Sequence, residues 1–398
     1  MSDQGPLAGI RVLELASWFY VPGCAAILAA HGADVVKIEP AGSADPVRAN
    51  RNSGSAASPS FELVNNRKRS IQLNLRSEAG LEVLERLISQ TDVFLTNVRG
   101  KSLERLGMDA ESVTGRHPRL IYAQGTGYGP LGPLAEAPAF DNVAYWARGG
   151  ISEVLRTDDD PPVQLVGALG DLPTSVTLAA GILMALWRRE REGRGGIVDV
   201  SLYGAGLWAN GAAIAGALVG SPPTRSRSRL FRANPLSTVY RCKDDHWVQF
   251  LMGQTDRYWQ PVCQALGRGD LITDERFTTH EARLLNHVAG ITEIQKAVGA
   301  ITLEELEHAM LGIDAPWSPV FDPTQAGNDE QAILNGYIVE KQDLTGATIR
   351  TIAPPFRLRG EPLQMGPAPE VGQHLEEVLL AAGYEWDEIT TLRERDAF

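Results

Sequence analysis

Short apolar runs alternate with segments of helical composition through the first half of the chain. Residues 10–15 and 33–38 read as strands and flank a helical segment at 22–31. The alternation continues with strands predicted at 70–75, 92–95, 120–124 and 197–201, and with helices at 78–89, 101–106, 174–187 and 205–219. This repeated pattern predicts an α/β fold, with a parallel sheet covered by helices.

A change in composition marks a domain boundary near residue 225. The stretch SPPTRSRSRLFR, rich in Pro, Ser and Arg, is typical of an exposed linker. We therefore expect a large domain over residues 1–224 and a small α+β domain over 225–324. In the small domain we predict strands at 236–240 and 247–251 and helices at 256–266 and 292–311. Beyond it we predict paired strands within 338–359 and a last helix at 373–382.

The net charge and the cysteine content disfavour several classes of protein. The formal net charge of −12 argues against a protein that binds nucleic acid or an anionic membrane surface. Three widely spaced cysteines, Cys24, Cys242 and Cys263, suggest neither a disulfide framework nor a zinc site, so we expect a reducing cytoplasm. The longest apolar stretch, 176–187, is about half the length that crosses a bilayer, and no secretory signal precedes the first strand.

The glycine-rich segment 124–133 follows a predicted strand, as a dinucleotide-binding loop would. Pro130 and Pro133 oppose that reading, because the loop would have to open a helix and these prolines favour a turn or an extended segment. The sequence also lacks a Walker A loop, a G-x-S-x-G elbow and an H-E-x-x-H motif. NAD binding and the commonest hydrolase classes are therefore disfavoured.

Basic residues offer candidate contacts to a phosphate-rich ligand. Arg67, Lys68 and Arg69 precede a predicted strand, and Arg99 and Arg105 follow the next one. Guanidinium groups match phosphate in geometry. A solvated charged loop is the alternative, and the local sequence leaves both open.

Asp171 is the most distinctive carboxylate. It ends an apolar, glycine-flanked segment, 166–171, directly before the predicted buried helix. A carboxylate in this position is partly desolvated, and its small neighbours leave room for a substrate. An N-terminal helix cap is the alternative role, because Asp is a favoured cap.

Six ordered segments together resemble the class III coenzyme A transferases, the CaiB/BaiF family. This family includes formyl-CoA transferase, carnitine CoA-transferase and, as a branch, α-methylacyl-CoA racemase. The resemblance covers almost the whole chain, and the segments that carry it are 6–14, 32–39, 66–71, 92–99, 168–171 and 193–199. The resemblance implies an interlocked homodimer, with a Rossmann-like CoA-binding domain completed by residues 325–398.

The resemblance also assigns roles to residues. It makes Asp171 the catalytic nucleophile of an acyl-CoA:carboxylate CoA-transferase, which works through an aspartyl mixed anhydride and an aspartyl-CoA thioester. It implies CoA binding by Ala16, Ser17, Arg67, Lys68, Arg69, Asn97, Arg99 and Arg105, and a substrate pocket containing Phe19, Phe140 and Asp141. The implied partners are acyl-CoA, as substrate, and a carboxylic acid acceptor, with no metal and no permanently bound cofactor.

Two departures from the family pattern bear on the substrate and the reaction. Phe19 stands where formyl-CoA transferase has a glutamine, which implies a larger and more apolar acyl group. The racemase branch has a histidine before the aspartate matched by Asp141 and a glutamate in the small domain, whereas this chain has Phe140 and Gln254. An α-methylacyl-CoA racemase and a non-catalytic acyl-CoA-binding protein remain the alternatives.

Overall fold

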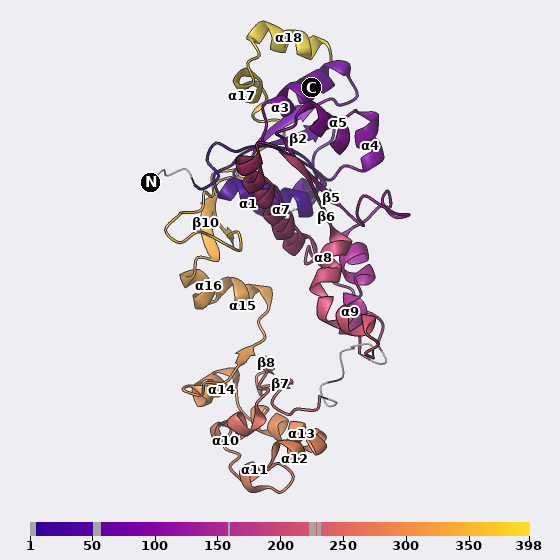
Figure 1. The fold of residues 1–398 in the computed structure, drawn as a ribbon. Coiled ribbons are helices and arrows are strands. Elements are labelled where there is room, and N and C mark those ends of the chain that lie inside the picture. The colour runs from indigo at the N-terminus through magenta and orange to yellow at the C-terminus, as the bar shows by residue number, and fades with distance from the viewer. Residues whose placement is uncertain (1–4, 51–56, 158–159, 223–227, 229–231) are drawn as a thin grey trace. The chain divides into compact units, whose positions relative to one another are not determined.

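The structure is a computed structural model of the 398-residue chain, and it describes residues 5–50, 57–157, 160–222, 228 and 232–398 (Figure 1). The described residues group into two compact units. Unit 1 takes in those of 1–152, 164–223 and 330–398, and unit 2 those of 153–163 and 224–329. The short helix α6 (Ile151–Leu155) contains the first junction between them.

Unit 1 is built on a six-stranded parallel sheet, as predicted. Its strands are β1 (Arg11–Leu15), β2 (Asp34–Pro40), β3 (Arg69–Leu73), β4 (Val93–Thr96), β5 (Ile121–Thr126) and β6 (Gly196–Ser201). They lie in the order β3-β2-β1-β4-β5-β6, and each neighbouring pair is parallel. The strand order reverses between β1 and β4. In doubly wound sheets of this kind, ligands bind beyond the carboxyl ends of the strands at the reversal.

Helices cover both faces of the sheet, because successive residues of each strand point to opposite sides. One face packs against α1 (Tyr20–Ala30) and α7 (Asp171–Glu192). The other packs against α3 (Glu78–Ser89), α4 (Gly100–Arg105), α5 (Ala110–Arg116), α17 (Leu375–Ala381) and α18 (Trp386–Glu394). Figure 1 shows the two C-terminal helices beside α3, so residues from both ends of the sequence share one core.

Shorter elements complete unit 1. They are the 3-10 helix η1 (Pro46–Ala49), α2 (Pro59–Val64), the π-helix η2 (Asn142–Arg148), α8 (Leu202–Ala209), α9 (Gly211–Leu218), α16 (Glu330–Leu334), and the antiparallel pair β10 (Ile338–Gln342) and β11 (Thr348–Ile352). The pairing of β10 with β11 confirms the strands predicted within 338–359. The predicted helix at 205–219 is wrong as a single element, because the chain turns at Asn210 between α8 and α9.

The long helix α7 begins three residues before its predicted start. Leu178, Ile182 and Leu186 recur along one buried stripe, which anchors the helix to the sheet. The helix ends at Gly193, whose φ of 74° is left-handed and therefore favours glycine. Within the described residues, none of the helices combines the length and apolar character that a membrane-crossing segment requires.

Unit 2 contains a three-stranded antiparallel sheet and a set of short helices. The strands are β7 (Val239–Arg241), β8 (Trp247–Phe250) and β9 (Trp317–Pro319), and the helices are α10 (Thr255–Ala265), α11 (Asp270–Thr273), α12 (His280–Leu285), α13 (His287–Val298), α14 (Leu303–Met310) and α15 (Pro323–Asn328). The predicted helix at 292–311 is wrong as one element. Gly299 ends α13, and a capping box between Thr302 and Glu305 starts α14.

Candidate active site

A cavity of about 1190 Å³ opens in unit 1 beyond the carboxyl ends of β1, β4, β5 and β6. It is lined by the segments that follow those strands, by residues 135–142, and by the start of α7. The segment after β5 contains no helix between residues 127 and 140, as its prolines predicted. The cavity thus lies where the sheet topology places ligands.

Two hydrogen bonds link the segments that follow β1 and β4, where the strand order reverses. The Asn97 side chain accepts from the Ser17 backbone N–H at 3.2 Å and donates to the Ser17 carbonyl at 2.7 Å. Both residues line the cavity. One side chain therefore fixes the relative position of two segments of the cavity wall.

Asp171 is the first residue of α7 and faces this cavity. The Asp141 carboxylate positions it indirectly, by accepting a hydrogen bond from the Gly170 N–H at 3.0 Å. A Cβ on Gly170 would lie 2.8 Å from the Tyr145 ring and 3.0 Å from the Asp141 side chain, so only glycine allows this approach. Gly170 is the N-cap residue of α7 and makes no side-chain cap. Asp171 is therefore free of the capping role that the sequence left open.

The electrostatics of Asp171 set it apart from an ordinary surface carboxylate. Burial, and after it the nearby Asp141 carboxylate, raises the pKa of Asp171 to about 7. The amino-terminal end of α7 favours a negative charge there, but it does not outweigh burial. Among the described residues, no hydrogen bond reaches the Asp171 carboxylate. Its oxygens are thus available to a ligand near neutral pH.

The cavity wall is strongly acidic. Its carboxylates belong to Glu104, Asp109, Glu111, Glu136, Asp141, Asp171 and Asp199. Arg99 is the single Lys or Arg among its described lining residues. Burial and then the Glu111 carboxylate raise the pKa of Asp199. A group with several negative charges would be repelled from the interior of such a cavity.

Seven of the residues singled out from the sequence meet at this cavity. They are Ser17, Phe19, Asn97, Arg99, Phe140, Asp141 and Asp171. Ala16 is buried directly behind the wall, where its carbonyl accepts a hydrogen bond from Lys37 Nζ at 2.8 Å. Arg105 lies on α4, with its guanidinium bonded to the Lys101 carbonyl and to Ser102 Oγ, and Ser102 itself lines the cavity.

The basic segment 67–69 lies away from the cavity lining. Lys68 is completely buried, and its Nζ lies 2.6 Å from Glu14 Oε2. Arg69 pairs with Asp34 at 2.6 Å and with Glu377 at 3.0 Å. Arg67 donates to the Ala29 carbonyl at 3.1 Å. In this structure all three side chains are engaged by protein groups.

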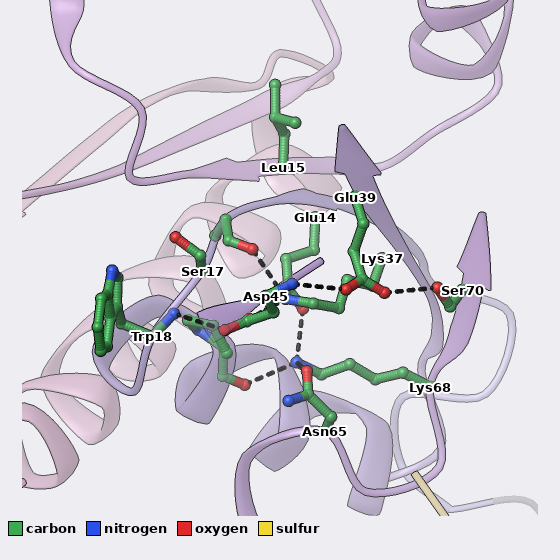
Figure 2. Close-up of polar contacts among 12 residues, drawn as sticks. Glu14, Leu15, Ser17, Trp18, Lys37, Glu39, Asp45, Asn65, Lys68 and Ser70 are labelled. Atoms are coloured by element: carbon green, nitrogen blue, oxygen red, sulfur yellow. Dashed lines mark hydrogen bonds and ion pairs between the residues drawn. The ribbon is translucent and has the colours of Figure 1, made fainter. Parts of the chain in front are cut away.

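Buried charges that the sequence reasoning missed support the loop after β1. Figure 2 shows Glu14, Lys37, Asp45 and Lys68 beside the loop that carries Ser17 and Trp18, and ion pairs join Lys37 to Glu14 and Asp45, and Glu14 to Lys68. The available signal was the segment DVVKIEP, which places Lys37 and Glu39 on one face of a strand between Val36, Ile38 and other apolar residues. Gln254, which stands where the racemase branch has a glutamate, lies in unit 2 immediately before α10.

Comparison with known proteins covers nearly the whole chain. A sequence profile of CoA-transferase family III matches residues 7–375. The chain is 33% identical over 395 residues to the (R)-2-hydroxy-4-methylpentanoate CoA-transferase of Clostridioides difficile, with 98% of each covered. It is 32% identical over 405 residues to the cinnamoyl-CoA:phenyllactate CoA-transferase of Clostridium sporogenes, covering 98% of this chain and 97% of that protein. The crystal structure of a CAIB/BAIF family protein from Brucella suis is similar with a TM-score of 0.85 and 25% identity, covering 95% of this chain and 100% of that one.

Proposed function

The chain belongs to CoA-transferase family III, and from this premise we propose that it is an acyl-CoA:carboxylate CoA-transferase with Asp171 as its nucleophile. The observation that carries the proposal is the position of Asp171, which faces a large cavity with a pKa raised to about 7. A carboxylate that is ionised near neutral pH and not hydrogen-bonded is suited to attack a carbonyl carbon.

The proposed reaction proceeds through covalent intermediates on Asp171. Its carboxylate attacks the thioester carbonyl, the C–S bond breaks, and CoA leaves as the thiolate. The acyl group then remains on Asp171 as a mixed anhydride. The thiolate then attacks the aspartyl carbonyl, which releases the donor acid and forms an aspartyl-CoA thioester.

The second half of the reaction mirrors the first. The acceptor carboxylate attacks the aspartyl carbonyl, forming a new anhydride and freeing the CoA thiolate. The thiolate attacks the acceptor's acyl carbon, and the Asp171 carboxylate leaves. Because one thioester replaces another, the sequence is close to balanced in energy and consumes no nucleotide. Apolar wall residues such as Trp18 and Phe140 support the proposal by limiting the access of water to these intermediates.

The proposed acyl group is apolar or aromatic. Trp18, Phe19 and Phe140 contribute aromatic surface to the cavity. The names of two relatives refer to acids with a branched aliphatic or a phenyl group. We extend this class to the present chain, with the acid carboxylate directed at Asp171 and its apolar end at the aromatic wall.

For the CoA moiety we propose contacts at Asn97, Arg99 and Arg105, near the end of β4. The acidic wall disfavours the phosphates inside the cavity, so they would lie toward its mouth. The roles of Ala16 and Ser17 would be to shape the wall through the backbone. We retain Arg67, Lys68 and Arg69 as proposed CoA contacts. To bind CoA, each side chain would have to give up the protein group that it now contacts.

The proposed assembly is an interlocked homodimer. Exposed apolar side chains gather on α7, α8 and α9 and directly after α9, including Met184, Trp187, Trp208, Leu218 and Val219. Large exposed apolar groups on consecutive helices are typical of an interface. The proposed compartment is the cytoplasm, which agrees with three buried cysteines that are free thiols.

One experiment separates the transferase from its two alternatives. The protein is incubated with isotopically labelled CoA, a panel of acyl-CoA donors and a panel of carboxylic acids, in deuterium oxide, and products are read by mass spectrometry. A transferase forms new acyl-CoA esters without deuterium at the α-carbon. A racemase incorporates deuterium there and makes no new ester, and a binding protein does neither. Absence of new esters across the panel contradicts the proposed function.

A further inference from the structure

The loop after β1 carries a tryptophan in an unfavourable backbone conformation. Trp18 has a φ of 70°, in the left-handed region that bulky residues rarely occupy. Its side chain remains 38% exposed and lines the cavity that contains Asp171. Strained conformations persist only where the surroundings enforce them, and they cluster at ligand sites.

The backbone of this loop is fixed at three consecutive residues by side chains from other elements. Lys37 Nζ donates to the Ala16 carbonyl at 2.8 Å. Asn97 bonds both backbone groups of Ser17. The Trp18 N–H donates to Asp45 Oδ1 at 3.3 Å. The loop therefore has little freedom to relax the strain at Trp18.

Two of these supports belong to a buried set of four charges (Figure 2). Lys37 Nζ lies 2.9 Å from Glu14 Oε1 and 2.9 Å from Asp45 Oδ2, and Glu14 Oε2 in turn pairs with Lys68 at 2.6 Å. All four side chains are at most 1% exposed. Two carboxylates and two ammonium groups balance, so none is left as an unpaired buried charge.

Asp45 is itself held from a second direction. Its N–H donates to Glu39 Oε1 at 2.9 Å, and Glu39 Oε2 pairs with Arg48 at 2.6 Å and accepts from Ser70 Oγ at 2.8 Å. Asp45 Oδ1 also accepts from the Val47 N–H, which caps η1. The position of the Trp18 backbone is thus set by buried groups from β2, β3 and η1.

The indole that this arrangement presents meets a second aromatic ring. Trp18 and Phe140 contact edge to face, with ring centroids 5.1 Å apart and an interplanar angle of 82°. Both line the cavity, and Phe140 is followed by Asp141, which positions the residue before Asp171. The pair forms an aromatic corner in the wall of the cavity that Asp171 also lines.

We propose that Trp18 is a specificity-determining residue for the acyl group, and that Asp45 and Lys37 are positioning residues that act through the loop backbone. This inference rests on the proposed function, in that the ligand is taken to be an acyl-CoA. The class of ligand selected is an acyl-CoA with an apolar, preferably aromatic, end that packs on the Trp18–Phe140 corner. A short acyl group does not reach the corner and gains nothing from it.

The test compares the binding of two thioesters. Kd values for 3-phenylpropanoyl-CoA and acetyl-CoA are measured by calorimetry in an Asp171→Asn background, so that no covalent step intervenes. Trp18→Ala is expected to raise Kd for 3-phenylpropanoyl-CoA by about 10–100-fold and Kd for acetyl-CoA by less than about threefold. The control Trp386→Ala, at an exposed residue of α18, leaves both unchanged. Equal losses for the two thioesters, or none, overturn the role of Trp18.

The positioning role has its own variants. Asp45→Ala removes the acceptor for the Trp18 N–H and is expected to reproduce the selectivity loss of Trp18→Ala, with no further loss when the two are combined. Asp45→Asn keeps an oxygen acceptor and preserves selectivity. The double variant Lys37→Met/Asp45→Asn removes the hydrogen bond to the Ala16 carbonyl and leaves no net charge in the buried set. It replaces Asp45→Ala as the test of positioning if that variant does not fold. Loss of binding without a change in the ratio of the two Kd values contradicts positioning.

Failure of the proposed function is recognised separately. If the unmodified protein transfers no CoA yet shows this binding pattern, the transferase proposal fails and the role of Trp18 in acyl selection remains. If it transfers CoA but Trp18→Ala leaves the selectivity unchanged, the function stands and the present inference is wrong.

Discussion

The Asp141 carboxylate accepts a hydrogen bond from the Gly170 N–H at 3.0 Å, one residue before Asp171. The same carboxylate contributes to raising the pKa of Asp171, after the larger effect of burial. One residue therefore both positions the start of α7 and makes the neighbouring carboxyl group harder to ionise. The two effects can be separated by substitution, since an amide keeps the hydrogen-bond acceptor and removes the charge.

The rate of CoA transfer should rise with pH, with a midpoint near pH 7. Only the ionised form of Asp171 is nucleophilic, and its pKa is raised to about 7. Asp141→Asn should move the midpoint to lower pH, because it removes the nearby negative charge and keeps the bond to Gly170. The profile of kcat/KM from pH 5 to 9 measures this. An unchanged midpoint, as expected for the control Asp314→Asn at an exposed carboxylate of unit 2, would show that Asp141 has no electrostatic influence.

The same burial should destabilise the fold when Asp171 ionises. A carboxyl group whose pKa is higher in the folded than in the unfolded state contributes stability below its unfolded pKa, near 4, and this is lost as pH rises through 7. Asp171→Asn should therefore raise the free energy of unfolding by about 1–3 kcal/mol at pH 8 and by much less at pH 4.5. Urea titrations at the two pH values test this. A gain that is equal at both values would point to a cause other than ionisation.

Much of the large unit follows from local sequence, whereas contacts made at long range do not. The strands around 93–96 and 121–126 lie within a residue or two of their predicted positions, because a buried parallel strand is a short apolar run between turns. The split between α13 and α14 was missed although Thr302 and Glu305 form a recognisable capping signal, since the helical periodicity continues through it.

The candidate site was predictable only in part for the same reason. Asp171 stands out locally, and the resemblance gave it a role. Lys68 reads as one member of an exposed basic loop, because its partner Glu14 is 54 residues away and nothing local indicates that both are buried. Its burial lowers its pKa to about 8 despite the pull of Glu14. Burial lowers the pKa of Lys37 as well, but the carboxylates of Glu14 and Asp45 outweigh it, so the pKa of Lys37 is raised.

Removing one charge from the buried set should be far more damaging than removing an exposed one. Lys68→Met should lower the free energy of unfolding by about 3–5 kcal/mol, because it leaves two carboxylates opposite one ammonium group. The double variant Glu14→Gln/Lys68→Met should recover part of this loss. Arg395→Met, which breaks the exposed pair with Glu82, is the matched control and should change little. Denaturant unfolding compares them, and similar losses for Lys68→Met and Arg395→Met would contradict the argument.

At position 18, a glycine variant should be more stable than an alanine variant, the reverse of the usual order within a helix. At a left-handed φ, glycine is unstrained and alanine is not, so Trp18→Gly should be more stable than Trp18→Ala by about 1 kcal/mol. Ala180→Gly, at an exposed position within α7, should show the ordinary order and lose about 1 kcal/mol. Thermal melts of the four proteins suffice. If Trp18→Ala is the more stable of its pair, the loop relaxes and the strain is not enforced.

The proposed dimer predicts that folding and association are inseparable. Light scattering of the unmodified protein should give the mass of two chains even at nanomolar concentration. Trp208→Asp and Leu218→Asp should lower the yield of folded protein, since each places a charge on the exposed apolar surface of α8 and α9. Leu285→Asp, on an exposed residue of α12, is the control. A folded monomer of the unmodified chain would contradict the interlocked assembly.

The proposed nucleophile, Asp171, gives the most direct prediction. Asp171→Ala and Asp171→Asn should reduce transfer by more than about 1,000-fold while Kd for the acyl-CoA stays within a few-fold, because the lost group acts on the reacting carbonyl and not in ground-state binding. The unmodified protein, given acyl-CoA without acceptor, should gain the mass of CoA on the peptide that contains Asp171. Hydroxylamine should remove this mass, since an aspartyl thioester is open to attack by a soluble amine. If Asp171→Asn still transfers CoA and no adduct forms, another residue is the nucleophile; if it loses only deuterium exchange at the α-carbon, Asp171 is an acid–base group and the racemase alternative is correct.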